Sequence, residues 1–239
     1  MNAKISLKKR IVSVILTVIM VFSMVPLSVF AANGGEAEVT LANGSPVNFN
    51  VYSQAVAYAN ANDGSTLKLL DDITVPEFEN LDDIPFVTGE FTLDLNGKSI
   101  NYVNVGSYDY DEEADEEIKG TPGTLTVTDS VGNGNIEYLA VNAGALTVAG
   151  GAVNYMYAEN YAAAVNVTGG TVENFSLSDG KDEEVSATVS GGVVRWLYMN
   201  GGTLTVNGGE YPEKINMDLG GGTTNITGGT FADLALRIS

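Results

Sequence analysis

The feature that most constrains this chain is a Gly-Gly pair that recurs at 150/151, 169/170, 191/192, 208/209 and 228/229. Counting from the second glycine as position 0, apolar residues recur at −5, −3, +2, +5 and +7. Around Gly170 these positions hold Val165, Val167, Val172, Phe175 and Leu177. Self-similarity at a period of about 20 residues is typical of solenoid proteins, in which each repeat forms one turn.

The template extends upstream to segments that lack the glycine pair. With Gly134 at position 0, Ile136, Leu139 and Val141 match positions +2, +5 and +7. Leu125 and Val127 supply the preceding apolar pair. With Lys98 at position 0, Leu93 and Leu95 are assigned to −5 and −3. Downstream of Gly209 the pattern slips by one residue, which predicts a β-bulge near Pro212.

Apolar pairs at a spacing of two place both side chains on one face of a strand, and the glycines supply corners. A single coil buries few side chains, so its strands need neighbouring coils to complete their backbone hydrogen bonds. The sequence therefore predicts an all-β fold, a right-handed, three-sided parallel β-helix over residues 65–239.

Residues 32–64 are predicted to cap the N-terminal end of this helix. Alternating apolar residues around Asn43-Gly44 predict a β-hairpin, and Ala55, Val56 and Ala59 form the apolar stripe of a short α-helix that stops at Asp63-Gly64. The last coil shows no such cap. We therefore expect either end-to-end self-association through that coil or a longer parent chain.

Residues 1–31 read as a signal peptide, with a basic start, an apolar run and small residues before a cleavage point after Ala31. No later stretch approaches the roughly 18 to 20 apolar residues of a membrane-spanning helix. We therefore expect a secreted, extracellular protein associated with the cell envelope and without a membrane span after cleavage.

Charge and composition exclude several functions. Cleavage removes four of the 11 Lys and Arg residues and no acid, which leaves 7 against 30 Asp and Glu, a net charge of −23. Such a surface repels nucleic acid and anionic membranes. The chain contains no Cys and no His, which excludes disulfides, Ser-His-Asp triads and the usual zinc sites.

Four kinds of segment resemble a known family and together cover nearly all of the mature chain: AVAYANANDGSTLKLLDDITV, FTLDLNGKSI, GTLTVTDSVGNGNI and the LTVNGG-type repeats. They resemble secreted bacterial right-handed parallel β-helix repeat proteins of the pectin-lyase-like superfamily. The resemblance implies fold and location, whereas that superfamily includes lyases, hydrolases, adhesins and modules with no known reaction. Its hydrolases carry a Gly-His-Gly motif, which a chain without His cannot contain.

Outward positions +4 and +6 carry most of the aromatic residues of the repeat. If −5, −3, +5 and +7 point inward, position +4 holds Tyr102, Tyr138, Tyr155, Asn174 and Trp196 on successive coils, and position +6 adds Tyr157 and Tyr198. At about 4.8 Å per coil, the +4 residues would form a column roughly 19 Å long. Aromatic plates with polar tips suit sugar rings, so the predicted glycan-binding site consists of the six aromatic residues Tyr102, Tyr138, Tyr155, Tyr157, Trp196 and Tyr198. Ordinary stacking that stabilises the sheet is the alternative explanation.

Outward positions −4 and −2 hold small polar residues, mainly Thr and Asn. Ladders that hydrogen-bond from coil to coil explain them, and an ice-binding face is the alternative.

The 107–120 insertion contains the run Asp109 to Glu117, with seven carboxylates in nine residues. Calcium prefers such oxygens, but the run lacks the glycine and the ligand spacing of an EF-hand loop. We predict a solvated, mobile acidic loop, no metal site and no cofactor, with calcium as the alternative.

These observations favour a secreted, non-catalytic cell-surface module that binds a polysaccharide or cell-surface glycan in the manner of an adhesin. No catalytic residue is predicted. The alternatives are a polysaccharide lyase or hydrolase that uses acidic residues, and a structural spacer of the envelope. An enzyme would need two carboxylates roughly 5 to 9.5 Å apart in a cleft.

Overall fold

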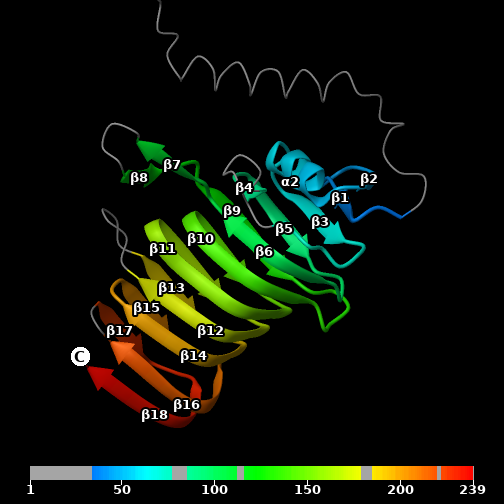
Figure 1. The fold of residues 1–239 in the computed structure, drawn as a ribbon. Helices are drawn as coiled ribbons and strands as arrows, with labels where there is room; N and C mark the ends of the chain where they lie inside the picture. Colours follow the sequence, from blue (N-terminus) through cyan, green and yellow to red (C-terminus); the bar gives the residue numbers. More distant parts are fainter. Residues whose placement is uncertain (1–33, 77–84, 112–115, 179–184, 220–221, 239) are drawn as a thin grey trace, which may run out of the picture. The chain divides into compact units, whose positions relative to one another are not determined.

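The computed structural model describes residues 34–76, 85–111, 116–178, 185–219 and 222–238. Most of these residues belong to a 16-stranded sheet that winds as a parallel β-solenoid of about six turns (Figure 1). The predicted β-helix repeat is therefore confirmed at the level of an all-β parallel solenoid. The predicted signal peptide, residues 1–31, lies outside the described residues.

The N-terminal segment has the hairpin and the helix that the sequence predicts. Strand β1 (Ala37–Thr40) pairs antiparallel with both β2 (Val47–Phe49) and β3 (Ser65–Leu69). Helix α2 (Tyr52–Asn60) buries Tyr52, Ala55, Val56 and Ala59 and packs against β1, β2 and β3. Its last residue is hydrogen-bonded to the solenoid, because the Asn60 side-chain oxygen accepts hydrogen bonds from the backbone N–H groups of Thr88 and Gly89.

The solenoid strands fall into two parallel stacks. Stack A consists of β3, β5 (Glu90–Asp94), β9 (Gly123–Thr128), the C-terminal halves of β10 (Asn135–Val148) and β11 (Ala152–Val167), β13 (Ser186–Val189), β15 (Thr203–Val206) and β17 (Thr223–Ile226). Stack B consists of β4 (Phe86–Val87), β6 (Ser99–Val105), the N-terminal halves of β10 and β11, β12 (Thr171–Ser178), β14 (Val193–Asn200), β16 (Glu210–Leu219) and β18 (Thr230–Ile238). Each turn thus contributes one strand to each stack.

The core consists of inward columns that follow the predicted period. Residues at position +5 lie directly opposite one another from strand to strand and are at most 2% exposed: Val103, Leu139, Met156, Phe175 and Leu197. Stack A contributes a matching buried column of Leu125, Leu146, Val165, Ala187 and Leu204. Stacked apolar columns bury side chains between neighbouring coils, which explains why the unit must repeat.

The predicted register of the first coil is wrong by two residues. Leu93 pairs with Val127, and Phe91 pairs with Leu125, so Phe91 and Leu93 are the equivalents of positions −5 and −3. Leu95 follows the strand, in the longer corner of this coil, and its N–H donates to the Thr128 carbonyl oxygen. The error arose because Leu95 is also buried, so the hydrophobic pattern did not reveal the extra corner residues.

Each residue of the Gly-Gly corner meets a different constraint, as the 191/192 pair shows. A Cβ on Gly191 would lie 2.3 Å from the Thr168 carbonyl oxygen on the preceding coil. Gly192 has φ +74°, in the left-handed region that side chains disfavour. The second glycine of all five pairs has φ between 71° and 102°. The pair therefore allows both a tight corner and close stacking of coils.

Two further features bear on the sequence predictions. The ladder between β16 and β18 is irregular between Tyr211 and Lys214, which confirms the predicted bulge near Pro212.

In place of the predicted loop, the acidic insertion contains an antiparallel hairpin of β7 (Tyr108–Asp111) and β8 (Glu116–Lys119). Its base is held by packing, because the ring of Tyr108 meets that of Phe86 edge-on at 5.7 Å.

Candidate functional site

The predicted aromatic positions lie in one register on the outer surface of stack B. The strand pairings place Tyr102, Tyr138, Tyr155, Asn174 and Trp196 directly opposite one another on successive coils. We call these five residues the aromatic column. The ring centroids of Tyr102 and Tyr138 lie 5.0 Å apart and the ring planes are 12° apart; for Tyr138 and Tyr155 the values are 5.1 Å and 13°. Three tyrosines thus form a continuous stack of nearly parallel rings.

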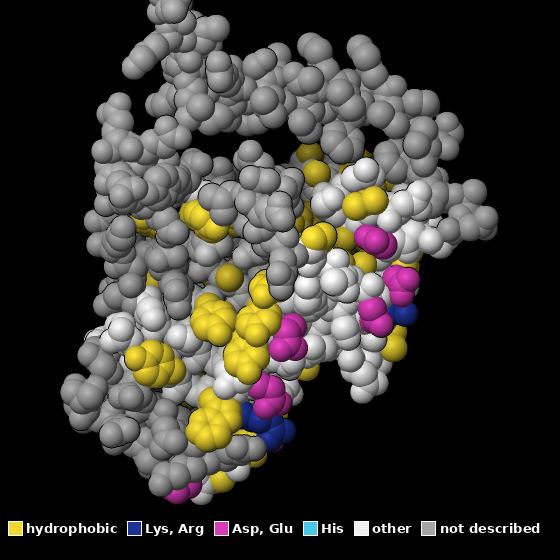
Figure 2. All heavy atoms as spheres, in the orientation of Figure 1, with side chains coloured by type: hydrophobic (Ala, Val, Ile, Leu, Met, Phe, Trp, Pro, Cys, Tyr) yellow, Lys and Arg dark blue, Asp and Glu magenta, His cyan; other side chains and the backbone are white. Residues whose placement is uncertain are grey.

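A second, shorter outward row runs beside the aromatic column. Tyr157, Ser176 and Tyr198 are paired on successive coils at position +6. Three rings of the two rows are well exposed, at 36% for Tyr155, 44% for Trp196 and 47% for Tyr198. Figure 2 shows hydrophobic side chains gathered on this face of the molecule. The surface therefore presents exposed aromatic rings to solvent, and they rest on a buried core.

The coil that carries β12 interrupts both rows. Its outward residues are Asn174 and Ser176, whereas the coils before and after it carry aromatic residues at both positions. The Asn174 side-chain amide donates to the Asn154 carbonyl oxygen at 3.0 Å, which holds this side chain against the preceding coil. A hollow of about 270 Å³ lies here, lined by Met156, Tyr157, Asn174, Phe175, Ser176, Trp196, Leu197 and Tyr198. We call it the notch.

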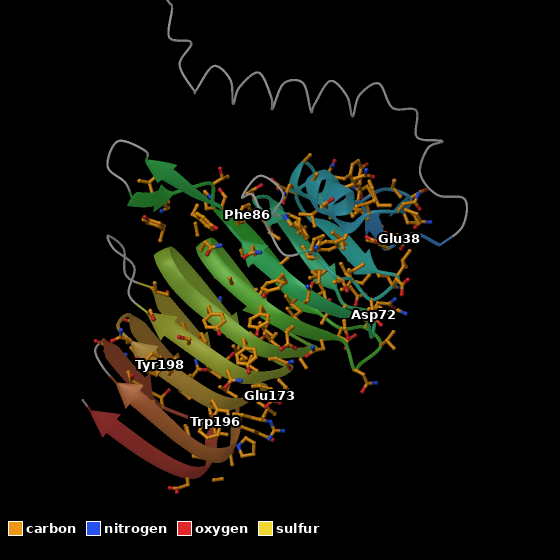
Figure 3. The ribbon with its side chains drawn as sticks, in the orientation of Figure 1. Glu38, Asp72, Phe86, Glu173, Trp196 and Tyr198 are labelled. Carbon is orange, nitrogen blue, oxygen red and sulfur yellow. The ribbon has the colours of Figure 1, made fainter. Side chains whose placement is uncertain are left out.

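Polar side chains at position +3 flank the aromatic column. Glu137 accepts a hydrogen bond from the side-chain amide of Asn154, and the Arg195 guanidinium donates to Glu173 at 3.0 Å. Figure 3 shows Glu173 and Trp196 on neighbouring strands of this region. The carboxylates closest to the column in sequence are thus engaged by side chains of neighbouring coils.

The stacked rings and the flanking carboxylate alter the acidity of the central tyrosine. Loss of contact with water raises the pKa of Tyr138, and the neighbouring Tyr102 hydroxyl and Glu137 carboxylate raise it further. The Tyr138 phenol thus remains a hydrogen-bond donor to a higher pH than an ordinary tyrosine.

The structure brings the predicted site residues together only in part. Tyr102, Tyr138 and Tyr155 form a continuous stack, but no ring lies between Tyr155 and Trp196 in the column. Neither Asn174 nor Ser176 was among the predicted site residues. The signal for the notch was that both outward positions of one coil are small, while those of both neighbouring coils are aromatic.

The described residues contain no group of three or more Asp, Glu, His or Cys side chains that could hold a metal ion. In that same part of the chain, no helix has the length and hydrophobicity needed to cross a bilayer.

Comparison with family models, with curated proteins and with solved structures gave no match for this chain.

Proposed function

We propose that this chain is a secreted, non-catalytic cell-surface module that binds a glycan through the aromatic column and the adjacent Tyr157 and Tyr198. The observation that carries the proposal is the column itself, with three stacked tyrosines and an exposed tryptophan in one register. Five stacked coils span roughly 19 Å, which matches several consecutive sugar rings of a chain lying along the column.

The chemistry of the column suits a sugar polymer. A pyranose ring has apolar C–H faces and a rim of hydroxyl groups, and a tyrosine or tryptophan offers an apolar plate with a polar tip. These side chains lose little conformational entropy on binding, because each has only two rotatable side-chain bonds. Mutual stacking of Tyr102, Tyr138 and Tyr155 restricts them further before any ligand arrives, which lowers the cost of ordering them.

Two finer features of the fold belong to the same proposal. Right-handed winding is what parallel strands joined by crossovers adopt in nearly all known sheets. A three-sided cross-section is supported by the outer surface of stack B, where Glu137 and Tyr138 both face away from the core between buried Ile136 and Leu139. Two consecutive outward residues break the alternation of a straight strand and indicate a corner. Both features would accord with the resemblance to the pectin-lyase-like superfamily.

An acidic polysaccharide lyase or hydrolase is the second candidate function. The observation that favours it is the placement of Glu137 and Glu173 at position +3, two coils apart and therefore roughly 9.6 Å apart along the stack. That spacing is close to the upper limit for a carboxylate pair of an inverting glycosidase. Both carboxylates are engaged by neighbouring side chains, which favours a structural role for them.

The test is to measure binding of the purified protein to a panel of plant, mucosal and bacterial glycans, with calcium and with a chelator, and to analyse the products for cleavage. Saturable binding without cleavage, equal in both buffers, is the expected result. If the protein cleaves a glycan and Glu137→Gln or Glu173→Gln abolishes the cleavage, the lyase or hydrolase function would replace the proposed binding function. Absence of binding across the panel would leave a structural spacer as the better account.

A further inference from the structure

We propose that the notch is a subsite for a single neutral sugar ring that projects from the bound chain, such as a side branch or a chain end. This inference rests on the proposed glycan-binding function and identifies the class of ligand. It starts from the composition of three successive coils, in which the outward pairs are Tyr155 and Tyr157, then Asn174 and Ser176, then Trp196 and Tyr198. Aromatic walls thus stand on both sides of a polar floor.

The width of the notch fits a puckered ring better than a flat one. The two walls are separated by two coil spacings, roughly 9.6 Å. A planar aromatic ring in contact with two plates needs roughly 7 to 8 Å between them, at 3.5 to 4.0 Å per contact. The extra space suits a saturated pyranose, which is thicker than an aromatic ring. The hollow of about 270 Å³ lies at the same level, and its lining also includes Met156, Phe175 and Leu197, which are buried.

The floor supplies groups that recognise hydroxyls. Ser176 and Asn174, whose side chains carry a hydroxyl and an amide, both line the notch. The amide nitrogen of Asn174 is engaged by the Asn154 carbonyl, which fixes the orientation of this side chain and leaves its oxygen as an acceptor. Together with the tyrosine hydroxyls of the walls, the notch offers both donors and acceptors to the rim of a sugar.

The charges around the notch favour a neutral sugar over a uronic acid or a sialic acid. The charged side chains of the flanking row from β10 to β14 are Glu137, Glu173 and Arg195, and Arg195 is paired with Glu173. The residues that line the notch carry no charge. A carboxylated sugar would therefore meet an excess of negative charge in a chain whose net charge is −19.

The test uses pairs of neutral polymers that share a backbone: linear mannan with galactomannan, and cello-oligosaccharides with xyloglucan. Polygalacturonate serves as the anionic probe. Trp196 is the sole tryptophan of the chain and belongs both to one wall of the notch and to the aromatic column, so its fluorescence reports ligand binding at this surface. Asn174→Tyr fills the notch and completes the column, and Asn166→Tyr makes the same change on the outer surface of stack A. Ser176→Tyr is the second notch variant, and thermal unfolding verifies that each variant is folded.

We expect the wild type to bind a branched polymer about tenfold more tightly than its linear backbone, with a saturable change in Trp196 emission, because the enclosed ring adds a contact that the backbone lacks. Asn174→Tyr should abolish that preference, whereas Asn166→Tyr, on the opposite stack, should leave it unchanged. Equal wild-type affinity for both members of each pair, or an unchanged preference in both notch variants, would overturn the subsite and leave the glycan proposal intact. Tighter binding of polygalacturonate would overturn its neutral specificity. Absence of wild-type binding to every probe would overturn the glycan proposal itself.

Discussion

The outer surfaces of stack A and stack B belong to the same coils and differ sharply in chemistry. Position −4 of stack A carries Thr126, Thr147, Asn166, Thr188, Thr205 and Asn225 in register, where position +4 of stack B carries the aromatic column. Both surfaces lie over equally buried apolar columns. The comparison teaches that inward residues and corner glycines specify this solenoid, so its outward residues are free to specialise.

Two small residues at the ends of stack A strands satisfy their polar groups within the protein. At position −2, the hydroxyl groups of Thr168 and Thr227 donate to carbonyl oxygens of the preceding coil, at 3.3 and 3.5 Å. On stack B, by contrast, large rings project into solvent. The first surface therefore has the features of a structural ladder, and the second exposes the rings on which the proposed glycan binding depends.

The largest expected effect tests whether the two surfaces share one core. We expect Phe175→Ala, beneath stack B, to lower the free energy of unfolding by about 3 to 5 kcal/mol, and Leu146→Ala, beneath stack A, by about 2 to 5 kcal/mol. Both side chains are at most 1% exposed. Urea unfolding measures both values. A loss below about 1 kcal/mol in either variant would show that the corresponding stack is not part of a common core.

The next effect concerns the corners that join the stacks. We expect Gly192→Ala to lower the free energy of unfolding by about 2 to 3 kcal/mol. The backbone of Gly192 is left-handed, and a Cβ at this position would lie 2.7 Å from the Gly169 carbonyl oxygen. Gly132→Ala is the matched control, because Gly132 has φ +90° and open space around it. It should cost about 1 kcal/mol. Equal losses would mean that close stacking of coils does not constrain the corner.

A smaller difference separates the two surfaces within a single strand. Tyr138 and Thr147 both belong to β10, one on each stack. Tyr138→Ala removes two ring contacts and should cost about 1 to 2 kcal/mol, whereas Thr147→Ala should cost less than about 0.5 kcal/mol. Thermal unfolding of the two variants checks this. If Tyr138→Ala proved neutral, the stack of rings would not contribute to the stability of the sheet.

The smallest expected effect is a dependence on pH in the corner near stack A. Partial burial raises the pKa of the Asp129 carboxyl. Hydrogen bonds from four backbone N–H groups outweigh this effect and hold the pKa below its usual value of 3.8; the donors are Gly134, Gly97, Gly132 and Val131. A lowered folded-state pKa gives stability that is present above pH 3.8 and is lost as pH falls through the lower pKa.

Solvent screening limits this contribution to less than about 1 kcal/mol. Asp129→Asn should therefore show a slightly smaller loss of stability than the wild type between neutral pH and pH 3, measured by urea unfolding at each pH. An identical pH profile for the two proteins would contradict a role for this carboxylate.

The sequence predicted those parts of the fold that repeat. The glycine pairs and the apolar period identified the stacked register of Tyr102, Tyr138, Tyr155 and Trp196. The register failed at Leu93 and Leu95, where the corner is longer and a buried leucine imitates the pattern. Periodicity reports which side chains point inward, but it does not count residues in an irregular corner.

The candidate site was predicted as a row of residues and not as a shape. The notch depends on the side-chain amide of Asn174 turning toward the Asn154 carbonyl, and such a hydrogen bond leaves no trace in the hydrophobic pattern. The hairpin of β7 and β8 was missed because its acidic composition outweighed the alternation of Tyr108 and Tyr110. Local pairing between strands overrode what composition alone suggested.

The most direct test of the central claim compares matched double variants of the two surfaces on the glycan that the panel identifies. Tyr155→Ala with Trp196→Ala removes two rings of the aromatic column, and Thr147→Ala with Thr188→Ala alters the stack A ladder on β10 and β13. We expect the first pair to weaken binding about 30-fold or more, from about 1 to 1.5 kcal/mol per ring, and the second pair to leave the affinity unchanged. Undiminished binding by the folded aromatic double variant would contradict the account.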